Sequence, residues 1–134
     1  MKTHSAKEKG KRLQKWMASR ISKLTGMECG PDCPIESRQM GQNGPDIRLD
    51  QEARRRFPFT VECKNQETWS IPAFIDQAKA NAYPGTDWLL IVSKNRHRPV
   101  AIVDAEVFLK LLEKRKGGGD EKGEPIPSKM QDAK

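Results

Sequence analysis

The chain has 134 residues, enough for one domain with a single core, and only 35% of them are hydrophobic. No run approaches the roughly 18 apolar residues that a membrane-spanning helix needs, and no apolar segment near the start resembles a secretory signal. The net charge of +7 lies in residues 1–24, which hold eight Lys or Arg and one acid. We therefore expect a cytoplasmic protein with one basic element, which suits either a nucleic-acid partner or a merely solvated helix face.

Three cysteines, Cys29, Cys33 and Cys63, are too few for a disulfide framework. Cys29 and Cys33 have the spacing of half a zinc site, but the two histidines, His4 and His97, are scattered and do not complete it. We expect reduced thiols, and a structural zinc is the weaker alternative.

The first predicted element is a basic helix over residues 6–24 that ends at Gly26. Its apolar positions share one helical face, so we expect these residues to be buried: Leu13, Trp16, Met17, Ile21 and Leu24. A loop rich in Gly, Pro, Asn and Asp is predicted over residues 27–45, with room for a short strand at 34–39.

Two strands are predicted next, over residues 47–49 and 57–64, with Arg54, Arg55 and Arg56 in the loop between them. Apolar and polar residues alternate in the longer strand, which places Glu62 and Lys64 on the same face. A strand that directs a carboxylate and an ammonium to one face forms either a site or a salt-bridged surface.

The rest of the chain predicts a helix over residues 71–82 capped by Ser70, a strand buried on both faces over 88–92, and a returning strand over 100–103. A last helix should run from Asp104 to about Lys114 and bury Val107, Phe108, Leu111 and Leu112. We expect residues 116–134 to be a disordered charged tail, so that one domain spans 1–115. The fold class is α/β, with a mixed central sheet flanked by helices in the order α-βββ-α-ββ-α.

The chemistry of phosphodiester hydrolysis fits three of these residues. The reaction needs carboxylates that hold a divalent cation and a positive side chain that stabilises developing charge. Asp46 and Glu62 supply two carboxylates, Lys64 supplies the positive charge, and the carbonyl of Cys63 can be a further oxygen ligand. Hard oxygen ligands favour Mg²⁺, for which Mn²⁺ can substitute. The alternative is that the three are surface charges of little energetic weight.

Gly44-Pro45-Asp46-Ile47 and Val61-Glu62-Cys63-Lys64 resemble the two halves of the PD-(D/E)xK nuclease motif, sixteen residues apart. The resemblance covers roughly residues 9–112 and implies a restriction-endonuclease-like fold. It also implies that Asp46 and Glu62 are metal ligands and that Lys64 is the catalytic lysine. Gln77 matches a position that often supports the site.

Within that superfamily the chain is most similar to small phage endonucleases of the Holliday junction resolvase type. The resemblance lies in the basic first helix with its Lys9-Gly10 pair, in the loop from Ser37 to Gly44, and in Glu62-Cys63-Lys64-Asn65-Gln66-Glu67. It implies a homodimer that cuts branched DNA and places Ser37 near the scissile phosphate. One position departs: many relatives carry a Glu on the first helix where this chain has Gln14, which puts metal affinity in doubt.

Several residues are candidates for contact with DNA, because phosphate contacts need only positive charge in the right place. Trp69 stands among polar neighbours and can either stack on a base or pack against the fold. The full set of predicted nucleic-acid-binding residues is Lys9, Lys11, Arg12, Lys15, Ser37, Arg38, Arg55, Trp69, Arg96 and Arg98.

Two classes of function remain open. The first is a Mg²⁺-dependent endodeoxyribonuclease, either structure-specific or a sequence-specific or general endonuclease of the same fold. The second is a non-catalytic nucleic-acid-binding module that keeps the nuclease fold, which the Gln14 departure weakly favours.

Overall fold

A computed structural model describes the backbone of residues 2–38 and 44–122, and the side chains of 6–38 and 44–115. Two compact units divide between Val103 and Asp104. In the first unit, helix α1 (Lys2–Thr25) confirms the predicted basic helix. It ends at Gly26, whose φ of 76° is a left-handed conformation that glycine adopts without strain.

The buried face of α1 differs from the prediction. Leu13, Gln14, Ala18 and Ile21 are buried, whereas Trp16 is 44% and Leu24 is 74% exposed. Gln14 and Ala18 lie near the centre of the contact face, which turns Trp16 toward solvent. The prediction that Trp16 and Leu24 are buried was therefore wrong, because apolar spacing alone does not reveal a polar or small residue at the centre of a helix contact.

Strands β1 (Ile35–Ser37) and β2 (Ile47–Leu49) pair antiparallel, with Ser37 opposite Ile47. Helix α2 (Gln51–Arg56) follows β2 directly and was not predicted. Its cap is Asp50, whose Oδ1 accepts a hydrogen bond of 2.8 Å from the Ala53 N–H. The three arginines predicted in a loop therefore lie on a short helix, and the two motif strands do not form a simple hairpin.

A mixed sheet forms the centre of the unit. Strand β3 (Phe59–Asn65) runs parallel to β4 (Asp87–Ser93), and β5 (Val100–Ile102) pairs antiparallel with β4. These strands match the predicted ones closely, and the α/β fold class with a mixed sheet flanked by helices is confirmed. Within the described residues, β1 and β2 form a separate two-stranded ladder rather than joining β3 in one sheet.

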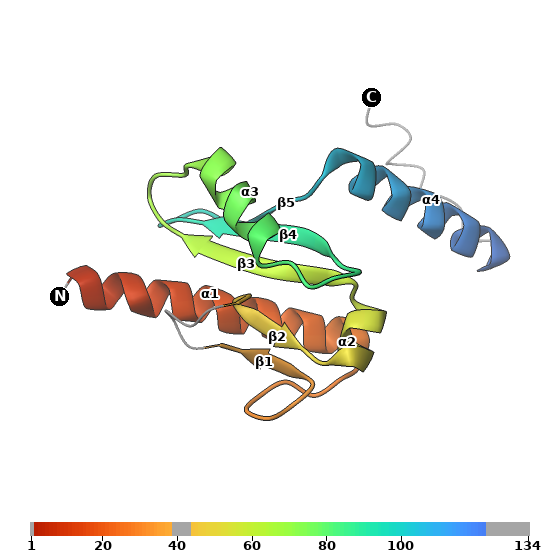
Figure 1. Ribbon diagram of the computed structural model, residues 1–134, viewed down its shortest axis with the longest axis horizontal. Coiled ribbons are helices and arrows are strands. Elements are labelled where there is room, and N and C mark those ends of the chain that lie inside the picture. Colours follow the sequence, from red (N-terminus) through yellow and green to blue (C-terminus); the bar gives the residue numbers. More distant parts are fainter. Residues whose placement is uncertain (1, 39–43, 123–134) are drawn as a thin grey trace. The chain divides into compact units, whose positions relative to one another are not determined.

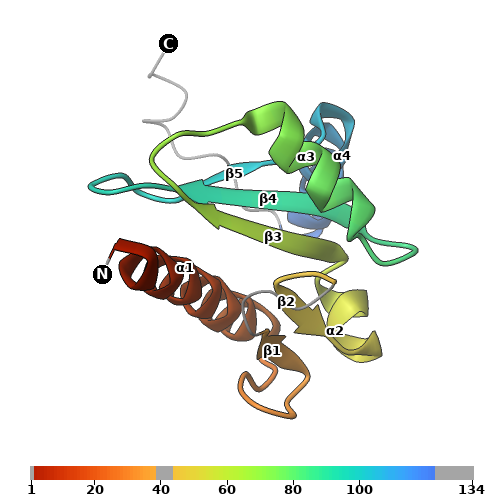
Figure 2. The same cartoon turned by 60° about the vertical axis from the view of Figure 1, so that its left-hand side comes forward.

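Helix α3 (Ile71–Ala80) covers one face of the β3–β4 sheet, and α1 lies on the opposite face (Figures 1 and 2). Beneath α3 the buried side chains of Phe74, Leu90 and Val92 form an apolar cluster. Leu90 is registered with Glu62 and Val92 with Lys64. Registered neighbours share a face of a sheet, so Glu62 and Lys64 point to the same side as this cluster.

The second unit contains α4 (Ala105–Lys122). The predicted cap is confirmed, since Asp104 Oδ1 accepts hydrogen bonds from the N–H groups of Glu106 and Val107. Helical backbone continues through residues 116–122, which were predicted to be disordered, and residues 123–134 lie outside the described residues.

The prediction that the last helix buries its apolar stripe was wrong for three side chains, since Phe108, Leu111 and Leu112 are 42–51% exposed. The described part of this unit offers no second helix or strand for them to pack against. No helix in the described ranges has the length and apolar character needed to cross a membrane.

Leu90→Ala tests the importance of the cluster beneath α3. Leu90 is fully buried, so truncation should lower the free energy of unfolding by about 3 kcal/mol through lost burial and a residual cavity. Urea denaturation followed by circular dichroism measures the change. Leu24→Ala is the matched control at an exposed position and should change stability by less than about 0.5 kcal/mol. Equal losses in the two variants would contradict this assignment of the core.

Candidate active site

Asp46 connects the two ladders of the first unit. Gly44 has a φ of 96°, a conformation that other residues adopt only with strain, and buried Pro45 then leads the chain into Asp46 and β2. The Asp46 carbonyl accepts a hydrogen bond of 2.8 Å from the Arg38 N–H. Its Oδ2 accepts one of 2.7 Å from the backbone N–H of Cys63 in β3. The side chain of Asp46 thus reaches across to the strand that carries Glu62 and Lys64.

Glu62 is held from two sides. Only 3% of the residue is exposed, and its Oε1 accepts a hydrogen bond of 3.2 Å from Nδ2 of Asn81 at the end of α3. Its Oε2 lies 3.9 Å from Nζ of Lys64, a long ion pair. The Lys64 ammonium also lies 5.4 Å from the centre of the Phe74 ring. The prediction that Glu62 and Lys64 share a face is confirmed, and α3 is the element that covers them.

Burial disfavours the charged form of both carboxylates. Burial and the neighbouring Asp46 raise the pKa of Glu62 to about 7, although the Asn81 hydrogen bond and Lys64 act in the opposite direction. Burial also raises the pKa of Asp46, against the effects of the Cys63 N–H and Lys64. A cation bound between the two carboxylates would therefore reduce the free-energy cost of keeping them charged in the folded protein.

The backbone of Cys63 faces the same place. In a β-strand the N–H and C=O of one residue point to the same edge, so the Cys63 carbonyl points toward Asp46 and away from β4. Its thiol is different, because burial raises the pKa of Cys63 well above the ordinary value and keeps the sulfur protonated. The oxygen of Cys63, rather than its sulfur, is the group that suits a hard cation.

Two polar contacts near the site were not predicted. Asn81 holds Glu62, whereas Gln77, which was expected to support the site, is exposed and contributes its carbonyl to the Asn81 N–H at 3.1 Å. Asn81 lies four residues, about one helical turn, after Gln77, and this spacing was the signal in the sequence that could have pointed to Asn81. Gln14 is 2% exposed and its Oε1 accepts a hydrogen bond of 3.2 Å from the Ser37 hydroxyl, which ties α1 to β1.

The predicted DNA-contacting residues of α1 fall into two groups. Lys11, Arg12 and Lys15 are exposed. Lys9 is half-buried, and its carbonyl accepts a hydrogen bond of 3.2 Å from Nδ2 of Asn65 at the end of β3. Residues 39–43 of the predicted Gly-rich loop lie outside the described residues, and Ser37 and Arg38 flank that gap in half-buried positions.

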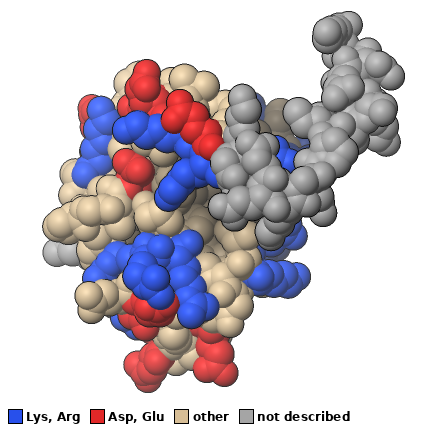
Figure 3. All heavy atoms as spheres, turned by 90° about the vertical axis from the view of Figure 1, so that its right-hand side faces the viewer, with Lys and Arg blue, Asp and Glu red and all other residues tan. Residues whose placement is uncertain are grey.

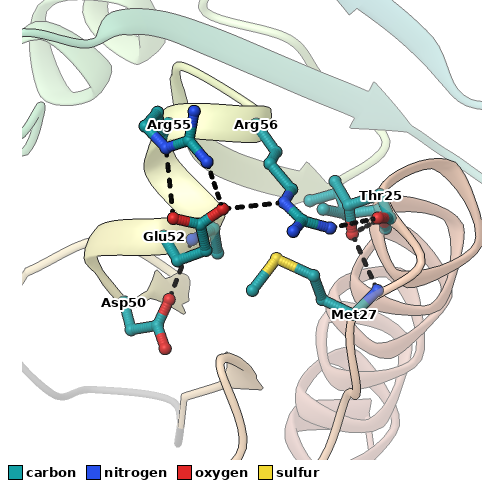
Figure 4. Close-up of polar contacts among 8 residues, drawn as sticks. Thr25, Met27, Asp50, Glu52, Arg55 and Arg56 are labelled. Atoms are coloured by element: carbon teal, nitrogen blue, oxygen red, sulfur yellow. Dashed lines mark hydrogen bonds and ion pairs between the residues drawn. The ribbon is translucent and has the colours of Figure 1, made fainter.

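The arginines of α2 are engaged in local contacts (Figure 4). Glu52 Oε2 lies 2.6 Å from Arg55 and 2.9 Å from Arg56, and Arg56 also donates to the Thr25 carbonyl at the end of α1 at 3.2 Å. These ion pairs lower the pKa of Glu52 to about 2. Figure 3 views the side of Figure 1 where α2 lies, and acidic side chains stand among the basic ones there. Arg55 therefore already has an anionic partner.

Trp69 is held by the fold. Its indole N–H donates to the carbonyls of Gln66 at 2.8 Å and Ser93 at 3.2 Å, and its ring packs against the cluster beneath α3. These contacts favour packing over base stacking. Arg96 and Arg98 are exposed in the loop between β4 and β5, and Arg96 has a φ of 64°.

Glu62→Gln tests the electrostatic cost at this site in EDTA. Glu62 binds its proton more tightly in the folded protein, with a pKa of about 7 against 4.5 ordinarily. Wild-type stability should therefore fall as the pH rises from about 4.5 to 7, and Glu62→Gln should remove this dependence. Above pH 7 the variant should be more stable by on the order of 2 kcal/mol in chemical denaturation. Glu28→Gln, at an exposed position, is the control, and an unchanged profile in Glu62→Gln would refute the burial of this charge.

Comparison with known proteins agrees with the geometry. A model of the family described as "Phage putative PDDEXK endonuclease" matches residues 5–118, which include Asp46, Glu62 and Lys64. No curated protein and no solved structure matches the chain. PDDEXK nucleases generally depend on divalent metal ions, and a nuclease implies a nucleic-acid substrate. The chain belongs to this family of phage endonucleases, within the PD-(D/E)xK nuclease superfamily.

Proposed function

We propose that the protein is a Mg²⁺-dependent endonuclease that hydrolyses phosphodiester bonds in DNA at Asp46, Glu62 and Lys64. The observation that carries the proposal is the 2.7 Å hydrogen bond from the Cys63 N–H to Asp46 Oδ2. It holds the carboxylate that precedes β2 beside the Glu62–Lys64 pair of β3, so that three residues from two segments form one site.

The donor set fits a hard divalent cation. Asp46 and Glu62 offer carboxylate oxygens with raised pKa values, and the Cys63 carbonyl points to the edge of β3 where Asp46 lies. No group of three or more His, Cys, Asp or Glu side chains in the described residues gathers as a metal site. A cation held by two carboxylates would complete its shell with the carbonyl, water and phosphate oxygens, which is the usual habit of Mg²⁺. When bound, it would polarise the phosphate and lower the pKa of an attacking water.

The residues around the proposed site then have separate roles. Lys64 lies in a half-buried position beside Glu62, where its ammonium can stabilise the charge that develops on the phosphate. Asn81 fixes one oxygen of Glu62 and leaves the other, which lies 3.9 Å from Lys64, directed to the site. The apolar cluster beneath α3 keeps water from this side of the carboxylates and strengthens their interactions with charge.

The substrate we propose is branched DNA, cut by a homodimer in the manner of a Holliday junction resolvase. Support comes from the sequence resemblance and from the exposed cations of α1. A sequence-specific or general DNA endonuclease is the alternative within the same fold.

One observation favours a non-catalytic nucleic-acid-binding module instead. Gln14 stands where many relatives carry a metal-binding Glu, and it is buried with its Oε1 accepting the Ser37 hydroxyl. A neutral amide there removes one negative charge from the neighbourhood of the cation. Without a carboxylate at Gln14, the negative charge that holds the cation would come from Asp46 and Glu62.

Lys64→Ala should lower the rate of DNA cleavage at saturating Mg²⁺ by at least about a hundredfold, because one group that stabilises the transition state is lost. Single-turnover cleavage of a labelled DNA measures the rate, and Asp46→Asn should abolish cleavage. Lys79→Ala, an exposed lysine of α3, is the matched control and should retain wild-type activity. Full activity in Lys64→Ala would contradict the assignment, and tight binding without cleavage by the wild type would establish the binding module.

A panel of four-way junction, flap, single-stranded and linear duplex DNA tests the proposed substrate. A junction resolvase should place paired symmetric nicks near the branch point of the four-way junction, only in the presence of metal. Equal cutting of all four substrates would keep the endonuclease and remove the preference for branched DNA.

A further inference from the structure

Two basic segments that are far apart in the sequence meet at one end of the β3–β4 sheet. Asn65, the last residue of β3, is registered with Ser93, the last residue of β4, and the basic loop of residues 94–99 follows directly. The Asn65 side chain donates to the carbonyl of Lys9 in α1 at 3.2 Å. Figures 1 and 2 both show the amino-terminal end of α1 and the β4–β5 loop on the same side as the carboxyl end of β3.

From this convergence we propose that the amino-terminal half of α1 and the β4–β5 loop form one binding surface for the phosphate backbone of nucleic acid, and that Trp69 is the residue that positions its loop half. We call this the basic surface and define it by Lys9, Lys11, Arg12, Lys15, Lys94, Arg96 and Arg98. The identification of nucleic acid as the partner of this surface rests on the proposed function. It does not depend on any step of catalysis.

Charge is the first argument for this partner. No acid occurs in residues 9–27 or 94–99, and most of the cations named above are exposed. Lys64 directly precedes Asn65 on β3, so the end of the strand where the two halves of the basic surface converge is next in the chain to the proposed catalytic residues. A phosphate chain bound at this end of the sheet would lie near the proposed site, and positively charged side chains are the groups that such a chain recognises.

The second argument is that the loop is held in place. Trp69 donates its indole N–H to the Ser93 carbonyl at 3.2 Å, where the loop begins, and Lys94 Nζ lies 5.3 Å from the centre of its ring. Glu67 Oε2 accepts the Asn95 N–H at 2.8 Å. The His97 ring lies edge-on to Trp69 at 6.5 Å. The loop therefore presents its arginines from a fixed base, which lowers the ordering cost of binding.

The α2 arginines form no part of this surface. Glu52 neutralises Arg55 and Arg56 at 2.6 and 2.9 Å, and Arg54 is held by the Leu49 carbonyl and lies over the Tyr83 ring at 4.6 Å. A phosphate would have to displace these partners before it could bind.

The test is the affinity of the full chain for a fluorescently labelled four-way DNA junction in EDTA, measured by anisotropy over a range of salt concentrations. Lys11→Ala/Arg12→Ala and Arg96→Ala/Arg98→Ala should each raise Kd about tenfold and reduce the salt slope by about two, since each removes two phosphate contacts. The matched control is Arg20→Ala/Lys23→Ala. It removes two exposed cations toward the other end of α1, where Lys23 is about 21 Å along the helix from Lys9, and should leave both values unchanged.

Trp69→Phe removes the indole N–H but keeps an aromatic ring. It should raise Kd about threefold in the wild type and have no further effect in the Arg96→Ala/Arg98→Ala background, because its role is to position those arginines. Additive losses in the two backgrounds would refute the positioning role. Equal weakening by the control pair, or unchanged binding in either surface pair, would overturn the proposal.

These outcomes are separate from those of the cleavage assay, because binding in EDTA needs no metal. A wild type that cuts DNA while the surface variants bind normally would refute the basic surface and leave the endonuclease. A wild type that binds through this surface but never cuts would leave the surface and refute the endonuclease.

Discussion

The hydrogen bond between the Cys63 N–H and Asp46 Oδ2 is the contact on which the arrangement of the site depends. The β1–β2 ladder and the β3–β4–β5 sheet are separate sets of strands in the described residues, so no continuous ladder fixes Asp46 relative to Glu62. A charged acceptor makes this one of the stronger kinds of hydrogen bond in a protein. It brings two partly buried carboxylates together: burial raises the pKa of both, and the neighbouring Asp46 raises that of Glu62 further.

The face of the sheet that carries the site explains why that cost is large. Glu62 and Lys64 share their side of β3 and β4 with Leu90 and Val92, and Phe74 of α3 closes over them. Low polarity there raises the energy of unpaired charge and equally strengthens the attraction of a bound cation or phosphate. Stability and the proposed function therefore oppose each other at Glu62, as is common where a protein holds charge ready for a ligand.

Much of the fold follows from local sequence patterns. Period-two alternation located β3, a continuous apolar run located β4, and Asp104 marked the start of α4. The candidate site could be identified from two segments, Gly44-Pro45-Asp46 and Glu62-Cys63-Lys64. Strand alternation alone places Glu62 and Lys64 on one face. The resemblance to the PD-(D/E)xK superfamily is confirmed by the family match. The assignment of metal and DNA contacts stays a prediction.

Two of the errors share one physical cause, since each depended on contacts between distant segments. The exposure of Trp16 follows from the packing of Gln14 and Ala18 against β-strands that the helix sequence does not reveal. The partner of Glu62 is Asn81, nineteen residues away, and only its position one helical turn after Gln77 marked it in the sequence. Helix α2 was a local omission, because Asp50 and Glu52 carry an ordinary amino-terminal cap signal that the three following arginines obscured.

The most direct test of the central claim is the binding of Mn²⁺ at pH 8, measured by isothermal titration calorimetry without DNA. Asp46→Asn keeps the size of the side chain and an oxygen for the Cys63 N–H but removes the negative charge. If Asp46 and Glu62 together hold the cation, the wild type should bind Mn²⁺ and Asp46→Asn should bind it at least about tenfold more weakly. Equal affinity in the two proteins would contradict a metal site built on the Asp46–Cys63 contact.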